Sequence, residues 1–328
     1  MLHPQHRILS NKAGILFTLL AASLMLTQCG DVKSSNTTPV DEKAPKPEPE
    51  PIRAVNAKTQ FAEINGRKIA YRTIGEGTPM ILCLRFRGNL DSWDPLFLDE
   101  LAKNYQVIVF DYSGFGLSTG TPSTNMISFA NDVKDLAKAL NLPRFIIGGW
   151  SFGGAVAQIV TTEMPELVTH TILIGTRPPG KFVHKPEQLF LQVSAKLQND
   201  LEDETILFFE PTSAISREKA KASHERIAAR TSDRDSMIKP EVWPNYVAGF
   251  ADFEKDPYGA RKKLAETDIP VLVISADHEI VFPPENWFEL NRKMKSVQLV
   301  VIPQAGHGPQ HQYPAMVANY IHSFIQER

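Results

Sequence analysis

The stretch FIIGGWSFGGAVAQIV (residues 145–160) contains an apolar run, a serine between glycines, and a run of small and apolar residues. The first run predicts a buried strand and the last predicts a helix, which places Ser151 on the turn between them. Such a sharp turn lifts a serine hydroxyl clear of a sheet and aims the first helical N–H groups at a reacting carbonyl. We therefore expect Ser151, in the spacing Gly149-x-Ser151-x-Gly153, to be a nucleophile.

The Gly-x-Ser-x-Gly spacing occurs a second time around Ser118, at residues 116–120. This copy follows a glycine-rich loop and precedes TGTPSTN (119–125), a sequence typical of turns. It lacks both the strand before the serine and the helix after it. The local context therefore favours Ser151 over Ser118.

Apolar runs alternate with helical patterns on both sides of the 145–160 stretch. Strands are expected at residues 80–84, 106–110, 145–148, 171–174, 271–275 and 297–302, and helices at 90–101, 125–140, 154–164, 285–294 and 314–326. Strands that alternate with helices indicate a parallel sheet, and continuous apolar strands indicate burial on both faces. The predicted class is α/β, with a mostly parallel central sheet flanked by helices.

Residues 177–265 interrupt this alternation, because they are polar, charged and helical in pattern. An insertion between two strands of such a sheet lies where ligands bind, at the carboxyl ends of the strands. We expect a helical cap over the site. The alternative is a helical subdomain with a structural role alone.

A serine hydroxyl needs a base, and histidine suits this role because its ordinary pKa is about 6.5. His307 lies in a glycine-flanked loop directly after the apolar strand QLVVI (298–302). His311, four residues on, lacks those glycines, and a surface or supporting role is expected for it. A supporting role is also open to His278.

Four segments together resemble the α/β-hydrolase fold family: EINGRKIAY (63–71), DYSGFGLS (111–118), GWSFG (149–153) and AGHG (305–308). They occur in the order of the family's first hairpin, Asp-x-x-Gly-x-Gly-x-Ser loop, nucleophile elbow and histidine loop. The resemblance implies the α/β-hydrolase fold from residue 57 to 328 and a serine–histidine–acid triad that ends with His307 as base. It also explains why a second serine motif is present.

The resemblance places the acid in the loop SADHEIVFP (275–283). The family pattern puts the acid four residues before a proline, which is Glu279. The family more often has aspartate, which makes Asp277 the alternative. The chain order serine, acid, histidine agrees with this fold.

A tetrahedral intermediate carries a negative oxygen that needs fixed hydrogen-bond donors. The resemblance assigns these donors to the backbone N–H groups of Phe152 and Phe86. Most relatives have His-Gly-x at the second position, whereas this chain has LRFRG (84–88). The donor loop therefore departs from the family pattern.

The departure places Arg85 and Arg87 near the expected mouth of the site. We expect these arginines to pair with Asp91 and Asp94 or to remain surface charges. The alternative is that they attract an anionic substrate.

Residues 1–28 have the pattern of a secretory signal: Arg7 and Lys12 are followed by an apolar run at 13–26. The run ends in LTQC, which resembles a bacterial lipoprotein processing box with Cys29 as the lipidated residue. Residues 29–56 are rich in Pro, Glu, Lys, Ser and Thr, and a disordered tether is expected. The predicted location is outside the cytoplasm, on a membrane through a lipid anchor that faces the periplasm or the cell exterior.

The 328-residue chain has a formal net charge of −2 and two cysteines. No basic excess indicates a nucleic-acid partner, and no metal, cofactor or nucleotide motif is recognised. We expect an esterase-like hydrolase of a small carboxylic ester or related acyl substrate, with its oligomeric state open. Alternatives are a non-catalytic small-ligand receptor on the same fold and a cofactor-free perhydrolase.

Overall fold

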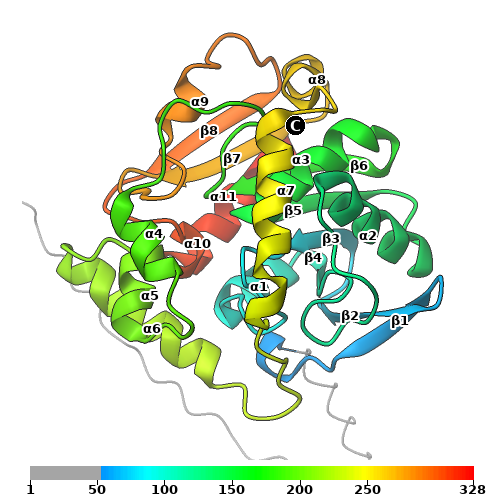
Figure 1. The fold of residues 1–328 in the computed structure, drawn as a ribbon, viewed down its shortest axis with the longest axis horizontal. Helices are drawn as coiled ribbons and strands as arrows, with labels where there is room; N and C mark the ends of the chain where they lie inside the picture. Colours follow the sequence, from blue (N-terminus) through cyan, green and yellow to red (C-terminus); the bar gives the residue numbers. More distant parts are fainter. Residues whose placement is uncertain (1–52) are drawn as a thin grey trace, which may run out of the picture. The chain divides into compact units, whose positions relative to one another are not determined.

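The computed structural model describes residues 53–328, in which eight strands form one sheet (Figure 1). The spatial order is β1-β2-β4-β3-β5-β6-β7-β8. Pairing is antiparallel between β1 and β2 and between β2 and β4, and parallel at every other pair. The strands are β1 (Gln60–Ile64), β2 (Arg67–Ile74), β3 (Thr78–Cys83), β4 (Tyr105–Phe110), β5 (Phe145–Trp150), β6 (Val168–Ile174), β7 (Val271–Ala276) and β8 (Val297–Ile302).

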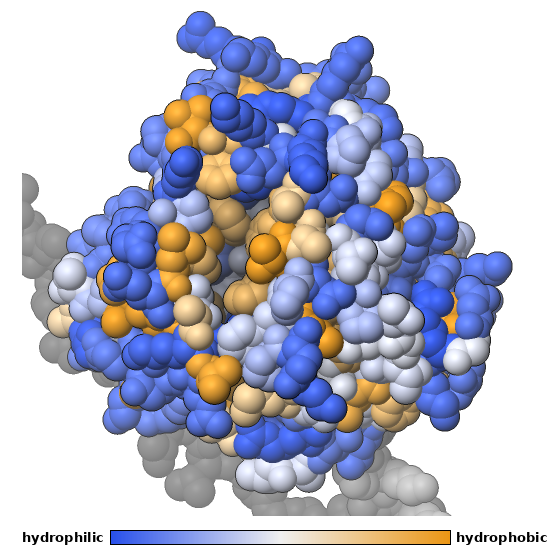
Figure 2. All heavy atoms as spheres, viewed as in Figure 1, coloured by the Kyte–Doolittle hydropathy of each residue, from blue (hydrophilic) through white to orange (hydrophobic). Residues whose placement is uncertain are grey.

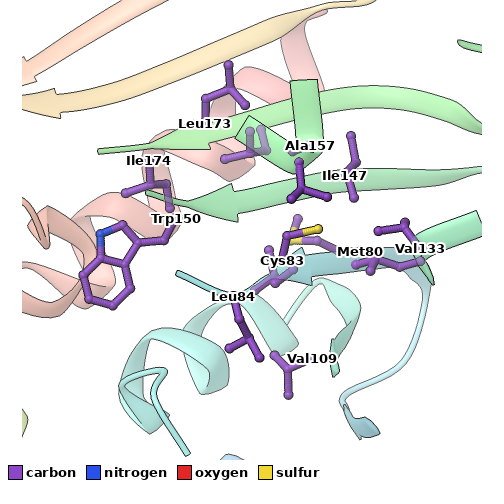
Figure 3. Packing of buried hydrophobic residues seen from close by; sticks show 14 of the residues in the cluster. Met80, Cys83, Leu84, Val109, Val133, Ile147, Trp150, Ala157, Leu173 and Ile174 are labelled. Atoms are coloured by element: carbon purple, nitrogen blue, oxygen red, sulfur yellow. The ribbon is translucent and has the colours of Figure 1, made fainter. Parts of the chain in front are cut away.

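The central strands are buried on both faces. Every residue of β5 and β7 is buried, whereas β8, at the edge of the sheet, is mostly half-buried or exposed. Figure 3 shows part of this core, which includes Met80 of β3, Ile147 of β5 and Leu173 of β6. The predicted α/β class with a mostly parallel sheet is confirmed.

Two groups of helices cover the sheet. In one group α1 (Pro95–Ala102) packs against α11 (Pro314–Glu327). In the other, α2 (Met126–Ala139) packs against α3 (Phe152–Glu163), which also contacts α8 (Ala260–Glu266). Because α3 begins one residue after Ser151, its packing fixes the position of that residue.

Two predicted helices are shorter than expected. The helix expected at 90–101 begins at Pro95, where the Asp94 side chain accepts a hydrogen bond from Leu96 N (2.9 Å) as an N-cap. The helix expected at 285–294 is α9 (Glu285–Phe288), which is followed by turns and by Arg292 at φ +65°. A residue at positive φ does not continue an α-helix.

The chain between β6 and β7 (residues 175–270, the insertion below) contains the predicted helical segment. Its helices besides α8 are α4 (Gln188–Ser194), α5 (Leu201–Phe208), α6 (Ala214–Ala228) and α7 (Trp243–Lys255). Helix α4 packs on α5, α5 packs on α6, and α6 packs on α10 (Pro309–Gln312). Helices α7 and α8 instead pack on α2 and α3, beside the sheet.

Ordered structure begins before residue 57, the predicted start of the hydrolase domain. Residues 54–56, expected at the end of the tether, form a short 3-10 helix, and Ala54 and Ala57 are buried. Arg230 donates to both of their carbonyl oxygens (2.6 and 3.0 Å), and Ala54 N donates to Asp99 (2.7 Å). Hydrogen bonds to a buried guanidinium fix this segment on the body of the protein.

The predicted signal segment, Cys29 and nearly all of the predicted tether lie outside the described residues. Within residues 53–328, no helix has both the length and the apolar character needed to cross a membrane.

Candidate active site

Ser151 lies on a strained turn between β5 and α3. Its φ is +58° and its ψ is −116°, a backbone conformation that residues other than glycine rarely adopt. The strain is held by the sheet, because Ser151 N donates to Ile174 O of β6 (2.9 Å). Strained backbone of this kind gathers at functional sites, where the surrounding structure enforces it.

The two flanking glycines permit this turn through close backbone approach. A Cβ atom on Gly149 would lie 2.1 Å from the carbonyl oxygen of Gly153. A Cβ atom on Gly153 would lie 2.0 Å from the carbonyl oxygen of Cys83, at the end of β3. These distances are far below van der Waals contact, so the serine can occupy this position only between glycines.

The structure brings His307 and Glu279 together. His307 Nδ1 lies 2.9 and 2.8 Å from the two carboxylate oxygens of Glu279, and both side chains are buried (3% and 0% exposed). Oε1 of Glu279 also accepts hydrogen bonds from the backbone N–H groups of Val281 (2.9 Å) and Phe282 (3.2 Å). Because a carboxylate faces Nδ1, the ring hydrogen lies there and Nε2 keeps its lone pair.

A glycine that the sequence analysis did not single out makes room for this pair. Gly175, directly after β6, has φ +50°, and a Cβ atom there would lie 3.1 Å from His307 Nδ1 and 3.2 Å from Glu279 Oε2. The carbonyl oxygen of His307 would be closer still, at 2.6 Å. The one signal in the sequence was a glycine at the end of a predicted strand.

Asp277, the alternative acid, is turned away from His307. Its side chain is 42% exposed, and His278 Nε2 lies 3.7 Å from one of its oxygens. His278 itself pairs through Nδ1 with Glu210, in the loop after α5.

The histidine loop is fixed from two sides. Trp150 Nε1 donates to the carbonyl oxygen of His307 (2.7 Å), and Gly308 N donates to the carbonyl oxygen of Phe208 at the end of α5 (2.7 Å). A Cβ atom on Gly306 would lie 2.3 Å from the carbonyl oxygen of Phe209. The glycines beside His307 therefore allow the insertion to pack directly on this loop.

His311 is buried, so the surface role that was open to it is wrong. It is buried against the Trp150 ring (4.6 Å between centroids), and its Nε2 accepts a hydrogen bond from Asp94 N (3.3 Å). Burial lowers its pKa to about 4, because the apolar surroundings disfavour the charged ring.

Ser151 and His307 line one small cavity of about 40 Å³. Its other walls come from the loop after β3 (85–87) and from the insertion, through α4, α5 and the segment between them. A cavity of this size has room for about two or three water-sized groups. Apolar side chains surround a hollow between α4 and α7 in Figure 2, and Leu189, Leu191 and Val247 of these helices are exposed.

The side chains of Phe152 and Phe86, the two expected oxyanion donors, lie in different surroundings. The Phe152 ring is buried in the core, where it packs edge-on against Phe129 (4.9 Å between centroids) and Tyr246 (5.0 Å). This leaves its N–H in the first turn of α3, where helical N–H groups lack partners within the helix. Phe86 lies on the cavity wall, with its ring against Tyr246 (5.2 Å).

The expected pairing of the loop arginines with Asp91 and Asp94 is wrong. Asp91 pairs with Arg72 (2.5 Å) and Arg230 (3.4 Å), and Asp94 pairs with Arg226 (2.5 Å). Arg226 and Arg230 come from residues more than 130 positions later in the chain, which a local reading of the sequence could not bring to these carboxylates.

No cluster of three or more His, Cys, Asp or Glu side chains that could hold a metal ion occurs among residues 53–328.

Comparison with known proteins agrees with the fold. The family model described as "alpha/beta hydrolase fold" matches residues 78–314. A proline iminopeptidase of Pestalotiopsis fici is 26% identical over 285 residues, which cover 82% of this chain and 99% of that protein.

Two solved structures are also similar. An alpha/beta hydrolase fold protein from Chitinophaga pinensis superposes with a TM-score of 0.75 at 28% identity, over 84% of this chain and 100% of that one. A thermophilic esterase from Thermogutta terrifontis does so with a TM-score of 0.62 at 24% identity, over 83% and 99%. This chain belongs to the α/β-hydrolase fold family.

Proposed function

We propose that this protein is a serine hydrolase that cleaves carboxylic esters or related acyl substrates through an acyl-enzyme. The observation that carries the proposal is the position of Ser151 and His307 on the wall of one cavity, with Glu279 buried against His307 Nδ1. A nucleophile, a base and a group that orients the base are the parts that acyl transfer requires.

In the proposed mechanism, Ser151 Oγ attacks the ester carbonyl carbon while His307 Nε2 accepts the hydroxyl proton. Glu279 holds the ring and stabilises the imidazolium that forms. The N–H groups of Phe152 and Phe86 bind the oxyanion. The intermediate then collapses, the C–O bond to the alcohol breaks, and His307 protonates the departing alcohol. A water molecule, deprotonated by His307, releases the acid and regenerates Ser151.

The relatives support the acyl-hydrolase class without choosing a substrate. One of those reported above is named an iminopeptidase and another an esterase. A shared fold does not fix the substrate, which depends on the cavity. We propose an ester as the first substrate class to test.

The proposal is tested with p-nitrophenyl acetate and butyrate and with a fluorophosphonate probe. Wild-type protein is expected to hydrolyse the esters and to be labelled, and Ser151→Ala should lose both activities. Ser118→Ala is the matched control, because Ser118 has the same motif but its Oγ donates to Asp111 O (2.8 Å) in the core. Its activity should remain.

Wild-type protein that neither hydrolyses these esters nor reacts with the probe would contradict the proposal. Ligand binding without turnover would then point to the receptor alternative. Halide oxidation that depends on acetate and peroxide, measured on the same preparation, would point to a perhydrolase.

A further inference from the structure

Arg85 lies on the wall of the cavity that contains Ser151, and its hydrogen-bonding capacity is largely unused. Its Nη1 donates to the carbonyl oxygen of Phe86 (2.8 Å). Its Nε is buried and has no hydrogen-bond partner. Among residues 53–328, its guanidinium forms no ion pair with a carboxylate.

The carboxylates around Arg85 have other partners. Asp91 and Asp94 have the arginine partners described above, and Glu204 of α5 pairs with His224 Nδ1 (2.7 Å). Glu204 still attracts Arg85 from a distance, whereas Arg87 repels it. The positive charge of the guanidinium is therefore not neutralised by an ion pair within the described part of the protein.

Aromatic rings fix the position of the cation. The guanidinium carbon of Arg85 lies 4.7 Å from the centroid of the Phe208 ring and 5.2 Å from that of Trp150. Such contacts favour a cation over a ring face and leave the edge of the guanidinium, with its N–H groups, to bind other partners. Because Phe208 also lines the cavity, Arg85 is held beside the place where substrate must lie.

Burial lowers the pKa of Arg85 to about 10, so the side chain remains a cation at neutral pH. Burial of an unpaired cation costs free energy because the charge loses hydrating water. Proteins therefore ordinarily pair a buried cation with an anion. A side chain kept in this state beside a nucleophile points to a partner that arrives with the substrate.

We propose that the substrate is an ester that also carries a carboxylate, and that Arg85 binds this carboxylate while Ser151 attacks the ester carbonyl. The proposal rests on the function proposed above and specifies its substrate class. The planar fork of a guanidinium matches a carboxylate with two parallel hydrogen bonds. The apolar walls formed by Phe86, Leu207 and Phe208 suit a short alkyl spacer between the two groups. Monoesters of short dicarboxylic acids have this form.

Arg87 provides a matched control on the same loop. It also lines the cavity, but its guanidinium donates to the carbonyl oxygens of Ser194, Lys196 and Leu197 (2.8–2.9 Å). It also lies 3.9 Å over the Trp243 ring. Its hydrogen bonds hold the insertion, which leaves Arg85 as the cation available to a substrate.

The test compares monoethyl succinate and monoethyl glutarate with the corresponding ethyl succinamate and ethyl glutaramate. Within each pair, one substrate carries a carboxylate and the other carries a neutral amide of the same shape. Acid release is followed in a pH-stat. Wild-type protein is expected to favour the carboxylate by about 10- to 100-fold in kcat/KM, the strength of a charge-assisted hydrogen bond. Arg85→Met should abolish this preference, Arg85→Lys should keep part of it, and Arg87→Met should keep it. Methionine retains the volume and apolar contacts of the stem.

Two results would overturn the inference. The first is equal kcat/KM on the two substrates of each pair, with hydrolysis that still depends on Ser151. This result would contradict the carboxylate proposal but not the proposed hydrolase function. A preference that survives in Arg85→Met does the same.

If no ester is turned over, glutarate is titrated into Ser151→Ala by calorimetry. Binding that is lost in the Ser151→Ala/Arg85→Met double variant supports the anion site independently of catalysis. Binding that is absent, or that does not depend on Arg85, overturns it. Thermal unfolding of each variant shows whether it is folded.

Discussion

Lowering the pH from 7 to 5 should destabilise the protein through His311. In the folded state burial lowers the pKa of this ring to about 4, whereas in an unfolded chain a histidine titrates near 6.5. The nearby carboxylate of Asp94 opposes this shift, and the cations Arg85 and Arg226 add to it. Protonation would also remove the lone pair with which Nε2 accepts the hydrogen bond from Asp94 N.

The sign and size of the change in the free energy of unfolding follow from proton binding. Between pH 6.5 and 4 the unfolded chain binds the extra proton and the folded protein does not, so the free energy of unfolding falls as the pH falls. Two proton-binding curves with these pKa values give a loss of about 2 kcal/mol at pH 5 and almost none at pH 7. Below pH 4 both states bind the proton and this loss stops growing.

The measurement is urea unfolding followed by tryptophan fluorescence at pH 7 and pH 5. Wild-type protein is compared with His311→Gln, whose amide oxygen can still accept a hydrogen bond from Asp94. Carboxylates titrate in both proteins, so the difference between their pH effects isolates His311. His184→Gln, at an exposed histidine, is the control and should behave as wild type. Equal loss of stability in wild type and His311→Gln would refute the reasoning.

Three further predictions concern the acid loop, the serine elbow and the second serine motif at Ser118. Glu279→Gln should lower kcat on p-nitrophenyl acetate by about 10³- to 10⁴-fold, because the neutral amide no longer holds the imidazolium, whereas Asp277→Asn should stay within about twofold; the reverse pattern would make Asp277 the acid. Gly153→Ala should cost about 3 kcal/mol or more of stability in thermal or urea unfolding, because its Cβ would lie 2.0 Å from the carbonyl oxygen of Cys83; a wild-type unfolding midpoint would show that the approach is looser than described. Ser118→Ala should lose about 1–3 kcal/mol on urea unfolding, because it leaves the buried Ala70 N–H without its hydrogen bond (2.8 Å); unchanged stability would argue against this anchoring role.

The sheet could be predicted from the sequence because its central strands are apolar throughout. Residues 106–110 and 271–275 coincide almost fully with β4 and β7. The spatial order of the strands could not be derived in the same way. β4 lies between β2 and β3, and this exchange depends on crossover connections rather than on any local pattern.

The turns that hold Ser151 and His307 were predictable because each is marked by glycines and directly follows a strand, β5 and β8 respectively. The choice between Glu279 and Asp277 was not, because both lie within three residues of the same strand end. The loop backbone decides, since Val281 N and Phe282 N hold the Glu279 carboxylate while Asp277 faces solvent. The state of Arg85 was equally hidden, because its expected partners are paired with Arg72 of β2 and with two arginines from the insertion.

The hydrogen bond from Gly308 N to Phe208 O has a consequence for turnover. The helix that ends at Phe208 forms part of the cavity wall and also supports the loop that carries His307. Movement of α5 away from the site would break this bond and release the loop from one of its two supports. An opening of the cavity at α5 would therefore also disturb the backbone that positions His307.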